Sequence, residues 1–359
     1  MEAGVRMAGQ PQEPAGLKLR IANLGRDFDI IPGRSLLETA LCAGLNLPHS
    51  CRSGHCGSCA ARLIRGDCHF PRGITLGLND EQRAQGMVLL CQAHARTDLE
   101  VDIALPISSA DTTIRRLPAR IEHCEALSHD VRRVMLRLPI VEDFAFQAGQ
   151  YLDVILPGGR RRAFSIASAP GSAPLLELHV RRVCGGAFTG PLFDGTLPSR
   201  LLNIEGPLGR FHYRDSAAPM LLVGGGTGLA PLDSILRHVI DRRFARRMHL
   251  YWGCREARDL YAHERLQGLL EQGMIEHYEP VLSQPDASWR GERGLVHEAV
   301  LRRIPDLKDY DVYAAGPPAM IEAIRSGFPD RGARQLYFDS FDYAPDALDR
   351  QRSAAASRS

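Results

Sequence analysis

The sequence predicts three domains of three different fold classes: a small α+β domain, an antiparallel β-barrel and a parallel α/β domain. Three changes of pattern along the chain indicate them. Short strands surround one helical segment over residues 17–105, strands punctuated by Gly and Pro fill residues 116–217, and strands alternate with helices over residues 218–345. With 359 residues the chain is long enough for two or three domains. We expect the small, polar and charged stretch 346–359 to be a disordered tail.

The first domain opens with two short strands, in "LKLRIANL" and "RDFDIIP", followed by the helical segment "SLLETALCAGL". Apolar residues recur at helical spacing in that segment, with Ser35 at the N-cap position and Glu38 at the capping-box position. The stretches "CAARLIRG" and "LEVDIAL" have the composition of further strands. Together these elements predict a small α+β domain.

The second and third domains differ in how their strands are connected. In the second, "VRRVMLRLP", "QYLDVILPGG", "RRAFSIASAP" and "LLELHVRRV" follow one another with turn residues between them, which favours an antiparallel barrel or sandwich. In the third, "PMLLVGGGTGLAPLDSILRHVI" predicts a strand, a glycine turn and a helix. "RMHLYWG", "IEHYEPVLS" and "DYDVYAAG" then predict buried parallel strands with helices between them.

Composition excludes several classes of protein. An apolar content of 44% with 24% charged residues is typical of a core-forming chain and not of a disordered one. A formal net charge of +2 without a long basic run argues against nucleic acid as a partner. The N-terminal stretch has no signal-peptide core, and no apolar run approaches the roughly 18 residues that span a bilayer. We therefore expect a cytoplasmic protein with no membrane partner.

Nine cysteines are present, and their spacing carries the strongest signal. In a reducing compartment, clustered cysteines bind metal or perform redox chemistry more often than they form disulfides. Cys51, Cys56 and Cys59 in "CRSGHCGSC" have the spacing C-x4-C-x2-C, and Cys91 follows in "MVLLCQAH". This is the plant-type [2Fe–2S] arrangement, in which four thiolates hold two irons.

The glycines of that loop support the same interpretation, and two alternatives remain beside it. Gly54 and Gly57 would let the backbone fold closely around a cluster and aim N–H groups at its sulfurs. A zinc site usually has two C-x2-C pairs, whereas only one is present here, and inert thiols are the third reading. Cys42 and Cys68 do not fit the spacing, and we expect them to be buried small apolar residues.

A glycine-rich stretch, "GGGTGLAP", follows the apolar run "MLLV" and precedes a predicted helix. In that position its N–H groups would face a pyrophosphate-sized anion, with Gly225, Thr227 and Gly228 as the binding residues. The second strand of this domain has no clear acidic residue at its end. Arg255 and Arg258 follow it and are candidates for contact with a 2′-phosphate.

At "RRRAFSIAS" the chain resembles the ferredoxin–NADP reductase superfamily, whose flavin domain carries an Arg-x-Tyr-Ser signature. The resemblance implies that Arg162 neutralises the flavin diphosphate, that Phe164 packs on the isoalloxazine and that Ser165 hydrogen-bonds near its N5. It also implies a β-grasp fold for the ferredoxin domain and FAD as cofactor of the barrel. Phe164 departs from the usual Tyr, which puts one hydrogen bond to the flavin in doubt.

Further residues follow from the same resemblance in "HVRRVCGGAFT". Gly186 and Thr189 match an element that places backbone N–H groups on the phosphates. His179, Val180 and Arg181 match strand positions that line the flavin in relatives, although a surface histidine without a ligand is an equal reading of His179. The turn "GPLGRF" resembles one that closes the flavin barrel and is expected to be structural.

Two stretches near the C-terminus complete the resemblance. "YAAGPPAM" resembles the Cys-Gly-Pro-Pro turn beside the nicotinamide, with Gly316 and Pro317 as binding residues and Ala315 in place of the cysteine. "YFDSF" resembles the terminal aromatic segment that shields the flavin, and core packing is the alternative. The residues expected beside the reacting ring are therefore Ser165, Phe164 and Phe341.

The three domains form a complete electron path, because a flavin accepts a hydride and releases electrons singly. The resemblance implies a reductase that passes electrons from NADH (NADPH is the alternative) to FAD, to [2Fe–2S] and to an acceptor protein. "GRRRAFSIASAP", "LELHVRR" and "LYWGCREARDLY" resemble the CDP-6-deoxy-glucoseen reductase type, which serves a deoxysugar dehydrase. The reductase component of a ring-hydroxylating oxygenase and a non-enzymatic redox-sensing module are the alternatives.

Overall fold

The computed structural model describes residues 16–45, 47–49, 52, 54, 57–71, 73, 77–78, 80–103, 114–140 and 144–341. The chain divides into two compact units, Met1–Ser108 and Ser109–Ser359, and each is described by itself. The expected tail 346–359 and the cysteines Cys51 and Cys56 lie outside the described residues. In the part of the chain that is described, no helix has the length and apolar character needed to cross a membrane.

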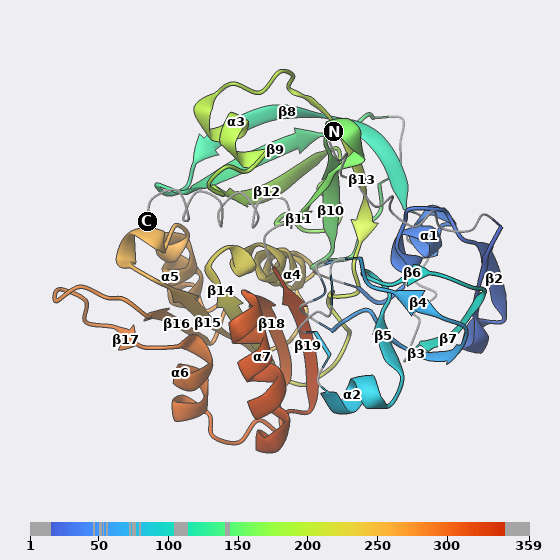
Figure 1. The fold of residues 1–359 in the computed structure, drawn as a ribbon. Helices are drawn as coiled ribbons and strands as arrows, with labels where there is room; N and C mark the ends of the chain where they lie inside the picture. The colour runs from blue at the N-terminus through green and yellow to red at the C-terminus, as the bar shows by residue number, and fades with distance from the viewer. Residues whose placement is uncertain are drawn as a thin grey trace, which may run out of the picture. The chain divides into compact units, whose positions relative to one another are not determined.

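The first unit is built on a five-stranded mixed sheet in the order β2-β1-β7-β3-β5 (Figure 1). The central pair β1 and β7 is parallel, and the other pairs of this sheet are antiparallel. A two-stranded sheet of β4 and β6 accompanies it. The bounds are β1 (Lys18–Ile21), η1 (Ala22–Leu24), β2 (Arg26–Asp29), α1 (Leu36–Cys42), β3 (Ala60–Arg65), β4 (Cys68–His69), α2 (Asp80–Ala84), β5 (Met87–Leu89), β6 (His94–Ala95) and β7 (Leu99–Ile103). The α+β class predicted for this region is confirmed.

Helix α1 begins where the sequence predicts. The Ser35 side chain accepts from the Glu38 backbone N–H, and the Glu38 carboxylate accepts from the Ser35 backbone N–H, which completes a capping box. The expectation for Cys42 was wrong: its side chain is exposed, because it ends the helix on the face opposite Leu37 and Leu41. Cys68 is half-buried rather than buried, and burial raises the pKa of its thiol to about 11.

The second unit begins with an antiparallel barrel whose six strands have the order β11-β10-β13-β8-β9-β12. A bridge between Ile166 and Leu178 joins the two edges and closes the barrel. Along β12, Leu176, Leu178 and Val180 belong to the barrel core, so the residues between them point outward. The bounds are β8 (Arg115–Ala126), β9 (Val131–Arg137), β10 (Tyr151–Ile155), η2 (Pro157–Gly159), β11 (Arg161–Ser165), β12 (Leu175–Arg181), α3 (Thr189–Asp194) and β13 (Leu201–Leu208).

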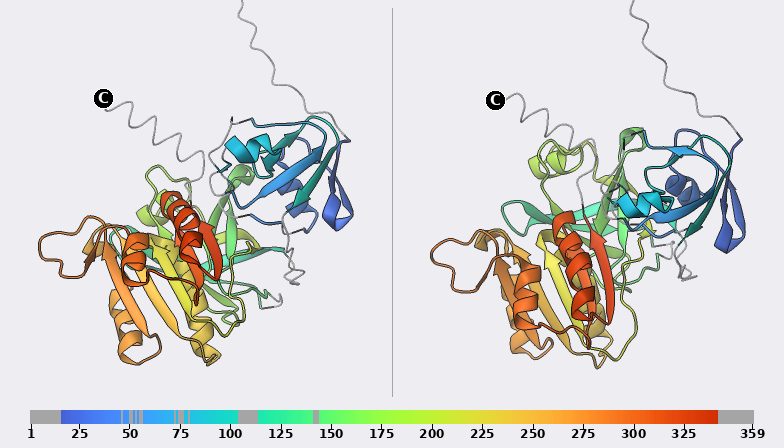
Figure 2. Two further views of the ribbon diagram at one scale, coloured as in Figure 1. Left: turned by 90° about the horizontal axis from the view of Figure 1, so that it is seen from below. Right: turned by 60° about the horizontal axis from the view of Figure 1, so that its bottom comes forward.

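The rest of the second unit is a parallel sheet in the order β17-β16-β15-β14-β18-β19 (Figure 1 and Figure 2). Helices α4 and α5 cover one face and α6 and α7 the other, because their apolar residues fall into two separate core clusters. The bounds are β14 (Met220–Gly225), η3 (Gly226–Gly228), α4 (Leu229–Asp241), β15 (Met248–Cys254), η4 (Ala257–Asp259), α5 (His263–Glu271), β16 (His277–Leu282), β17 (Glu292–Arg293), α6 (Val296–Arg303), β18 (Asp311–Gly316), α7 (Pro318–Gly327), η5 (Pro329–Arg331) and β19 (Gln335–Ser340). The predicted fold class is confirmed here also.

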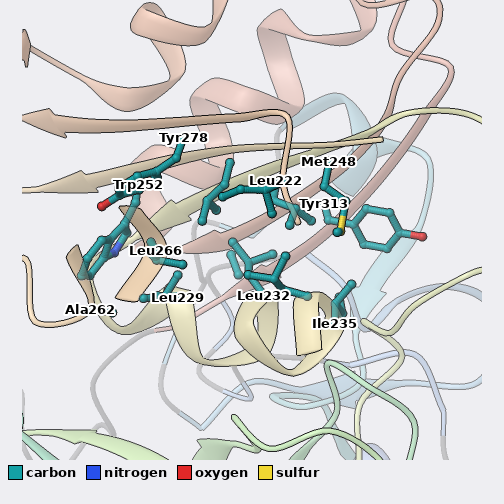
Figure 3. Packing of buried hydrophobic residues seen from close by; sticks show 14 of the residues in the cluster. Leu222, Leu229, Leu232, Ile235, Met248, Trp252, Ala262, Leu266, Tyr278 and Tyr313 are labelled. Atoms are coloured by element: carbon teal, nitrogen blue, oxygen red, sulfur yellow. The ribbon is translucent and has the colours of Figure 1, made fainter. Parts of the chain in front are cut away.

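One of these core clusters fixes the helix that follows the glycine turn. Leu229, Leu232 and Ile235, spaced by three residues along α4, pack against Leu222 of β14 and Trp252 of β15 (Figure 3). All five side chains are at most 1% exposed. The glycine turn is therefore held between a buried strand and a buried helix.

Candidate functional site

The first unit brings two of the four predicted cluster ligands together. Cys59 and Cys91 are 3% and 8% exposed, and the Leu90 N–H donates to the Cys59 carbonyl at 3.1 Å. The backbone thus joins the end of the cysteine loop to the turn after β5, which carries the fourth cysteine. The partners Cys51 and Cys56 lie outside the described residues.

The described glycines of the cysteine loop have the conformations that the sequence predicts. Gly54 and Gly57 have φ values of +84° and +72°, in the left-handed region that favours glycine. The Gly77 N–H donates to the Gly54 carbonyl at 2.9 Å, and a Cβ on Gly77 would lie 2.6 Å from that oxygen. The loop backbone is therefore pressed against a second segment. Thiols held in such a glycine-rich loop fit a [2Fe–2S] cluster.

Three further residues of this region, Gln92, Arg52 and His49, were not predicted. The Gln92 side-chain amide donates to the carbonyls of Arg52 and Cys91, at 2.8 and 3.0 Å, and so ties the loop to the fourth cysteine. Arg52 itself has φ +54°, unusual for a residue with a side chain. Its guanidinium lies 3.1 Å from His49 Nε2. Burial, and then Arg52, lower the pKa of His49 to about 3, so its Nε2 accepts that bond.

In the barrel, the two stretches assigned to the flavin meet. Arg162 and Phe164 lie on one face of β11, since they are two residues apart, and Ser165 ends the strand with 9% of its surface exposed. The Phe164 ring lies 5.4 Å from that of Phe188, which immediately precedes α3. The "RRRAFSIAS" strand and the "GGAFT" turn, more than 20 residues apart, are therefore in contact.

The glycine turn before α3 has no room for a side chain. A Cβ on Gly186 would lie 2.3 Å from Thr189 Oγ1, and Gly186 and its neighbours line a pocket of about 450 Å³. The Gly186 N–H donates to the Val183 carbonyl, and the Thr189 hydroxyl bonds to the Val183 N–H and carbonyl. Both residues shape the turn through these bonds. Phosphate donors would have to come from other N–H groups of the same turn.

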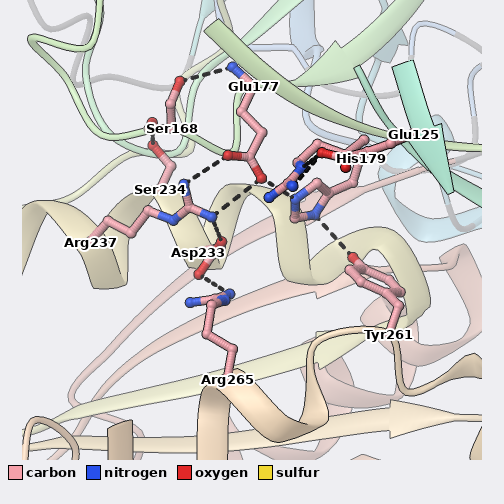
Figure 4. A network of polar contacts seen from close by, with 10 residues as sticks. Glu125, Ser168, Glu177, His179, Asp233, Ser234, Arg237, Tyr261 and Arg265 are labelled. Carbon is pink, nitrogen blue, oxygen red and sulfur yellow. Dashed lines mark hydrogen bonds and ion pairs between the residues drawn. The ribbon is translucent and has the colours of Figure 1, made fainter. Parts of the chain in front are cut away.

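On β12 the three expected flavin residues divide into two groups. The Val180 side chain is fully buried in the barrel core, so only its backbone is available to a ligand. His179 and Arg181 point the other way, toward the nucleotide sheet (Figure 4 shows His179). His179 is 7% exposed and has two hydrogen-bond partners, so it is not a surface histidine. Arg181 pairs with Asp130 at 3.1 Å and reaches Gly226 of the glycine loop.

In the nucleotide sheet, the glycine loop and the Gly-Pro-Pro turn pack directly on each other. A Cβ on Gly225 would lie 2.7 Å from Pro317 Cδ, and one on Gly228 would lie 2.0 Å from the Ala315 carbonyl oxygen. A side chain at either position would therefore separate the two loops. Both loops follow the carboxyl ends of adjacent parallel strands, β14 and β18, where open α/β sheets bind their ligands.

The two remaining predicted residues lie beside this edge. Ala315, in the place of the usual cysteine, is fully buried in a core cluster. Phe341 follows β19, is partly buried against the same cluster, and its N–H donates to the Gly316 carbonyl at 2.9 Å. The "YFDSF" stretch is thus a strand of the sheet, and Tyr337 packs on Tyr313 with ring centroids 4.8 Å apart. Core packing accounts for these aromatic contacts.

Comparison with known proteins matches a family model to each of three stretches of the chain. Residues 19–96 match the 2Fe-2S iron-sulfur cluster binding domain, residues 118–213 the oxidoreductase FAD-binding domain and residues 222–326 the oxidoreductase NAD-binding domain. A CDP-6-deoxy-L-threo-D-glycero-4-hexulose-3-dehydrase reductase from Yersinia pestis is 36% identical over 87% of this chain and 93% of its own length. The chain belongs to this family of iron–sulfur flavoprotein reductases.

One further relative and two solved structures are also similar to this chain. The reductase subunit of an aromatic O-demethylase from Amycolatopsis is 38% identical over 88% of this chain and 96% of its own. The crystal structure of an Amycolatopsis cytochrome P450 reductase superposes with a TM-score of 0.76 at 36% identity, over 90% of this chain and 98% of its own. A ferredoxin reductase of carbazole 1,9a-dioxygenase gives a TM-score of 0.72 at 27% identity, over 91% and 98%.

As a member of this family, the reductase uses a [2Fe–2S] cluster, FAD and a nicotinamide dinucleotide. It is an oxidoreductase that passes electrons to an acceptor protein. A flavin supplies the conversion of a hydride into single electrons. The predictions of family, cofactors and enzyme class are confirmed, and the enzymatic prediction holds over that of a redox-sensing module.

The reductase also has functional contacts that were not predicted from its sequence. Glu177 and Ser168 on the barrel bond to Arg237 and Ser234 on α4, and His179 bonds to Tyr261 (Figure 4). One signal was available: Glu177 is an acidic residue between Leu176 and Leu178 in the strand "LLELHV", so alternation places it on the face away from the barrel core. Its partners lie 60 residues further on, and no local pattern identifies them.

Proposed function

We propose that this reductase carries electrons from NADH to FAD, then to its [2Fe–2S] cluster, and then to a deoxysugar dehydrase. The observation that carries the electron path is the joining of the glycine loop, the Gly-Pro-Pro turn and barrel strand β12. Gly226, at the start of the nucleotide turn, lies against the Arg181 side chain of that strand. Donor and flavin sites within one unit fit a direct hydride transfer.

The residues proposed for each cofactor are those expected from the sequence, with their roles refined by the geometry. We propose four cysteines for the cluster, the strand and turn residues of the barrel for FAD, and the loop residues of the nucleotide sheet for NADH. For the cluster these are Cys51, Cys56, Cys59 and Cys91. For FAD they are Arg162, Phe164, Ser165 and the Val180 backbone, with Gly186 and Thr189 shaping the phosphate turn. For NADH they are Gly225, Thr227, Gly228, Gly316 and Pro317, together with Arg181, which was expected at the flavin but lies against Gly226. For Phe341 we propose a place beside the flavin.

We propose domain boundaries at 17–105 for the ferredoxin domain, 116–217 for the FAD barrel and 218–345 for the nucleotide domain. The element bounds support these limits, since β1 begins at Lys18, β8 at Arg115 and β14 at Met220. We also propose a cytoplasmic location. A reducing compartment keeps cysteines as thiols, which the ligands of a cluster must be.

The charges after β15 support NADH rather than NADPH. Arg255 lies 3.8 Å from Asp130 and 3.7 Å from Asp259, and Arg258 lies 2.7 Å from Glu256. Each arginine that would attract a 2′-phosphate therefore already faces a carboxylate. A dianionic phosphate would have to displace these partners or lie close to their negative charge.

The class of the acceptor protein is proposed from the relatives of this chain. The relative from Yersinia pestis is named for a hexulose dehydrase, and this chain matches 93% of its length, which supports a dehydrase as acceptor. The aromatic O-demethylase reductase subunit matches at a similar identity, so an oxygenase component is the second candidate. Both classes accept single electrons from a cluster, and the surface that selects between them includes residues around the cysteine loop.

The test uses the purified holoenzyme with each candidate acceptor. We expect flavin and [2Fe–2S] absorption, NADH oxidation coupled to cytochrome c reduction, and turnover when a purified hexulose dehydrase with its sugar substrate is added. Turnover with a demethylase or dioxygenase component alone would assign the second acceptor class. A colourless protein with one zinc after anaerobic preparation would overturn the electron path itself.

A further inference from the structure

A chain of three hydrogen bonds and one aromatic ring contact links barrel strand β12 to the nucleotide loop. It begins at Glu177, whose carboxylate lies 2.9 Å from His179 Nε2, and continues from His179 Nδ1 to the Tyr261 hydroxyl at 3.1 Å (Figure 4). The Tyr261 ring lies edge-on to that of Trp252, with centroids 5.1 Å apart. Trp252 Nε1–H then donates to the Gly226 carbonyl at 2.9 Å.

Burial and hydrogen bonding keep Glu177 ionised and the Tyr261 hydroxyl protonated. Glu177 is 6% exposed and His179 7%, while Trp252 has no exposed surface. Burial raises the pKa of Glu177, but the hydrogen bonds from His179 and Arg237 outweigh it and lower the pKa to about 2. Glu177 is thus a carboxylate that accepts the Nε2–H of His179. Burial holds the pKa of Tyr261 well above its ordinary value, so its hydroxyl keeps its proton where it lies 3.1 Å from His179 Nδ1.

Glu177 also reaches the other end of the nucleotide loop. Its carboxylate pairs with Arg237 of α4 at 2.9 Å, and Arg237 in turn pairs with Asp233 at 2.8 Å. Helix α4 directly follows the loop, and the Ser234 hydroxyl of the same helix donates to the Ser168 carbonyl of the barrel at 2.7 Å. One barrel strand therefore holds the loop at its start, through Trp252, and at its end, through α4.

The loop residue at the end of this chain has little freedom of its own. Gly226 has φ +55° and begins the 3₁₀ turn from which the loop would offer its N–H groups to a pyrophosphate. Its carbonyl is fixed only if the Trp252 indole is fixed, and the indole rests on the Tyr261 ring. A shift of the ring would rotate this peptide and redirect the neighbouring donors.

We propose that His179 and Tyr261 are positioning residues for NADH, which hold the glycine loop in register with the flavin strand of the barrel. The inference rests on the proposed hydride transfer. It reassigns His179 from a residue that lines the flavin to one that acts through Tyr261 and Trp252 on the nucleotide loop.

The test compares Tyr261→Phe with Tyr278→Phe in the holoenzyme. Each substitution removes one hydroxyl that lies 3.1 Å from a histidine Nδ1 and keeps the aromatic ring. The Tyr278–His263 pair joins β16 to α5 within the nucleotide domain, whereas the Tyr261–His179 pair joins that domain to the barrel. The two variants thus differ chiefly in which elements the lost bond connects.

The readout is stopped-flow bleaching of the flavin at a series of NADH concentrations. For Tyr261→Phe we expect the limiting rate to fall about two- to tenfold, the effect of one lost hydrogen bond, and the apparent Kd for NADH to rise. The flavin content should stay unchanged. The rate at which the protein, first reduced with dithionite and then freed of it, reduces cytochrome c should stay unchanged as well. The limiting rate and the affinity for NADH should fall less in His179→Asn, which keeps a polar atom near the position of Nδ1, than in His179→Leu.

Each outcome decides a separate point. If Tyr261→Phe and Tyr278→Phe give the same kinetics and differ only in thermal stability, His179 and Tyr261 are structural and the inference is wrong. If His179→Leu keeps the wild-type rate and Kd, the inference is wrong as well. If NADH fails to bleach the flavin of the wild-type protein, the proposed function fails before the inference is tested.

Discussion

The substitution Gly228→Ala tests the packing of the nucleotide site, because the structure leaves no space for a methyl group at this position. In Gly228→Ala the new Cβ would lie 2.0 Å from the Ala315 carbonyl oxygen, 2.5 Å from its carbon and 2.9 Å from Gly316 Cα. Contacts under 3.0 Å essentially never occur, and all three atoms belong to the backbone of β18, which has no rotamer to change. The Gly-Pro-Pro turn must move away from the glycine loop.

The magnitude follows from the cost of overpacking. Inserting a methyl into a packed site costs about 1–3 kcal/mol, and a clash with backbone belongs at the upper end. At about 2–4 °C per kcal/mol for a unit of this size, the apparent Tm should fall by about 6–12 °C. If about 1.4 kcal/mol of the strain also opposes nucleotide binding, NADH affinity falls about tenfold.

Thermal unfolding by circular dichroism and stopped-flow flavin reduction measure the two effects. Gly268→Ala is the matched control, since this glycine lies within α5 and a Cβ there would meet only the end of the Gln272 side chain, at 3.9 Å. Alanine is the better helix former, so the control should be stabilised by about 0.5–1 kcal/mol. Wild-type stability and NADH affinity in Gly228→Ala would refute the packing of these two loops.

Three further predictions concern the cluster, a buried ion pair and pH. Cys91→Ser should abolish cytochrome c reduction and leave NADH-driven ferricyanide reduction through the flavin, because a cluster needs four thiolates; if both activities persist, Cys91 is not a ligand. Asp311→Asn should cost about 3–5 kcal/mol in urea unfolding, because Arg246, 2.5 Å away and 2% exposed in its side chain, loses its carboxylate. The exposed control Asp306→Asn should change little, and equal losses in the two variants would contradict the reasoning. Glu177→Gln should be less stable than wild type at pH 7, and the difference should shrink as the pH falls from about 4.3 toward about 2, since a lowered folded pKa gives stability that protonation removes. A difference in Tm that is constant over that range would count against an ionised Glu177.

Local patterns in the sequence predicted the elements of the fold, and long-range contacts lay beyond them. The capping box at Ser35, the alternation along β12 and the buried parallel strands are all properties of short stretches, which is why they could be read directly. The orientation of His179 toward the nucleotide sheet could not be predicted in this way, because its partner Tyr261 lies 82 residues away in the sequence. Alternation along the strand implies that His179 and Val180 face opposite sides, and the resemblance that grouped both with the flavin did not use it.

The same limit applies to the site. Cysteine spacing predicted the cluster because its ligands follow a fixed pattern along the chain, and Gly225 and Gly228 could be proposed for the nucleotide because they adjoin a strand and a helix. The acidic partners of Arg181 and Arg255 were missed, since Asp130 lies in the β8–β9 hairpin, far from either arginine in sequence. The proposed preference for NADH therefore rests on a tertiary contact that no motif contains.

The most direct test of the electron path is anaerobic addition of NADH to the purified holoenzyme, followed by absorbance and by electron paramagnetic resonance. The account predicts that NADH bleaches the flavin and that the signal of a reduced [2Fe–2S] cluster then appears in the same chain. A flavin that bleaches while the cluster stays oxidised until an acceptor-independent chemical reductant is added would contradict it.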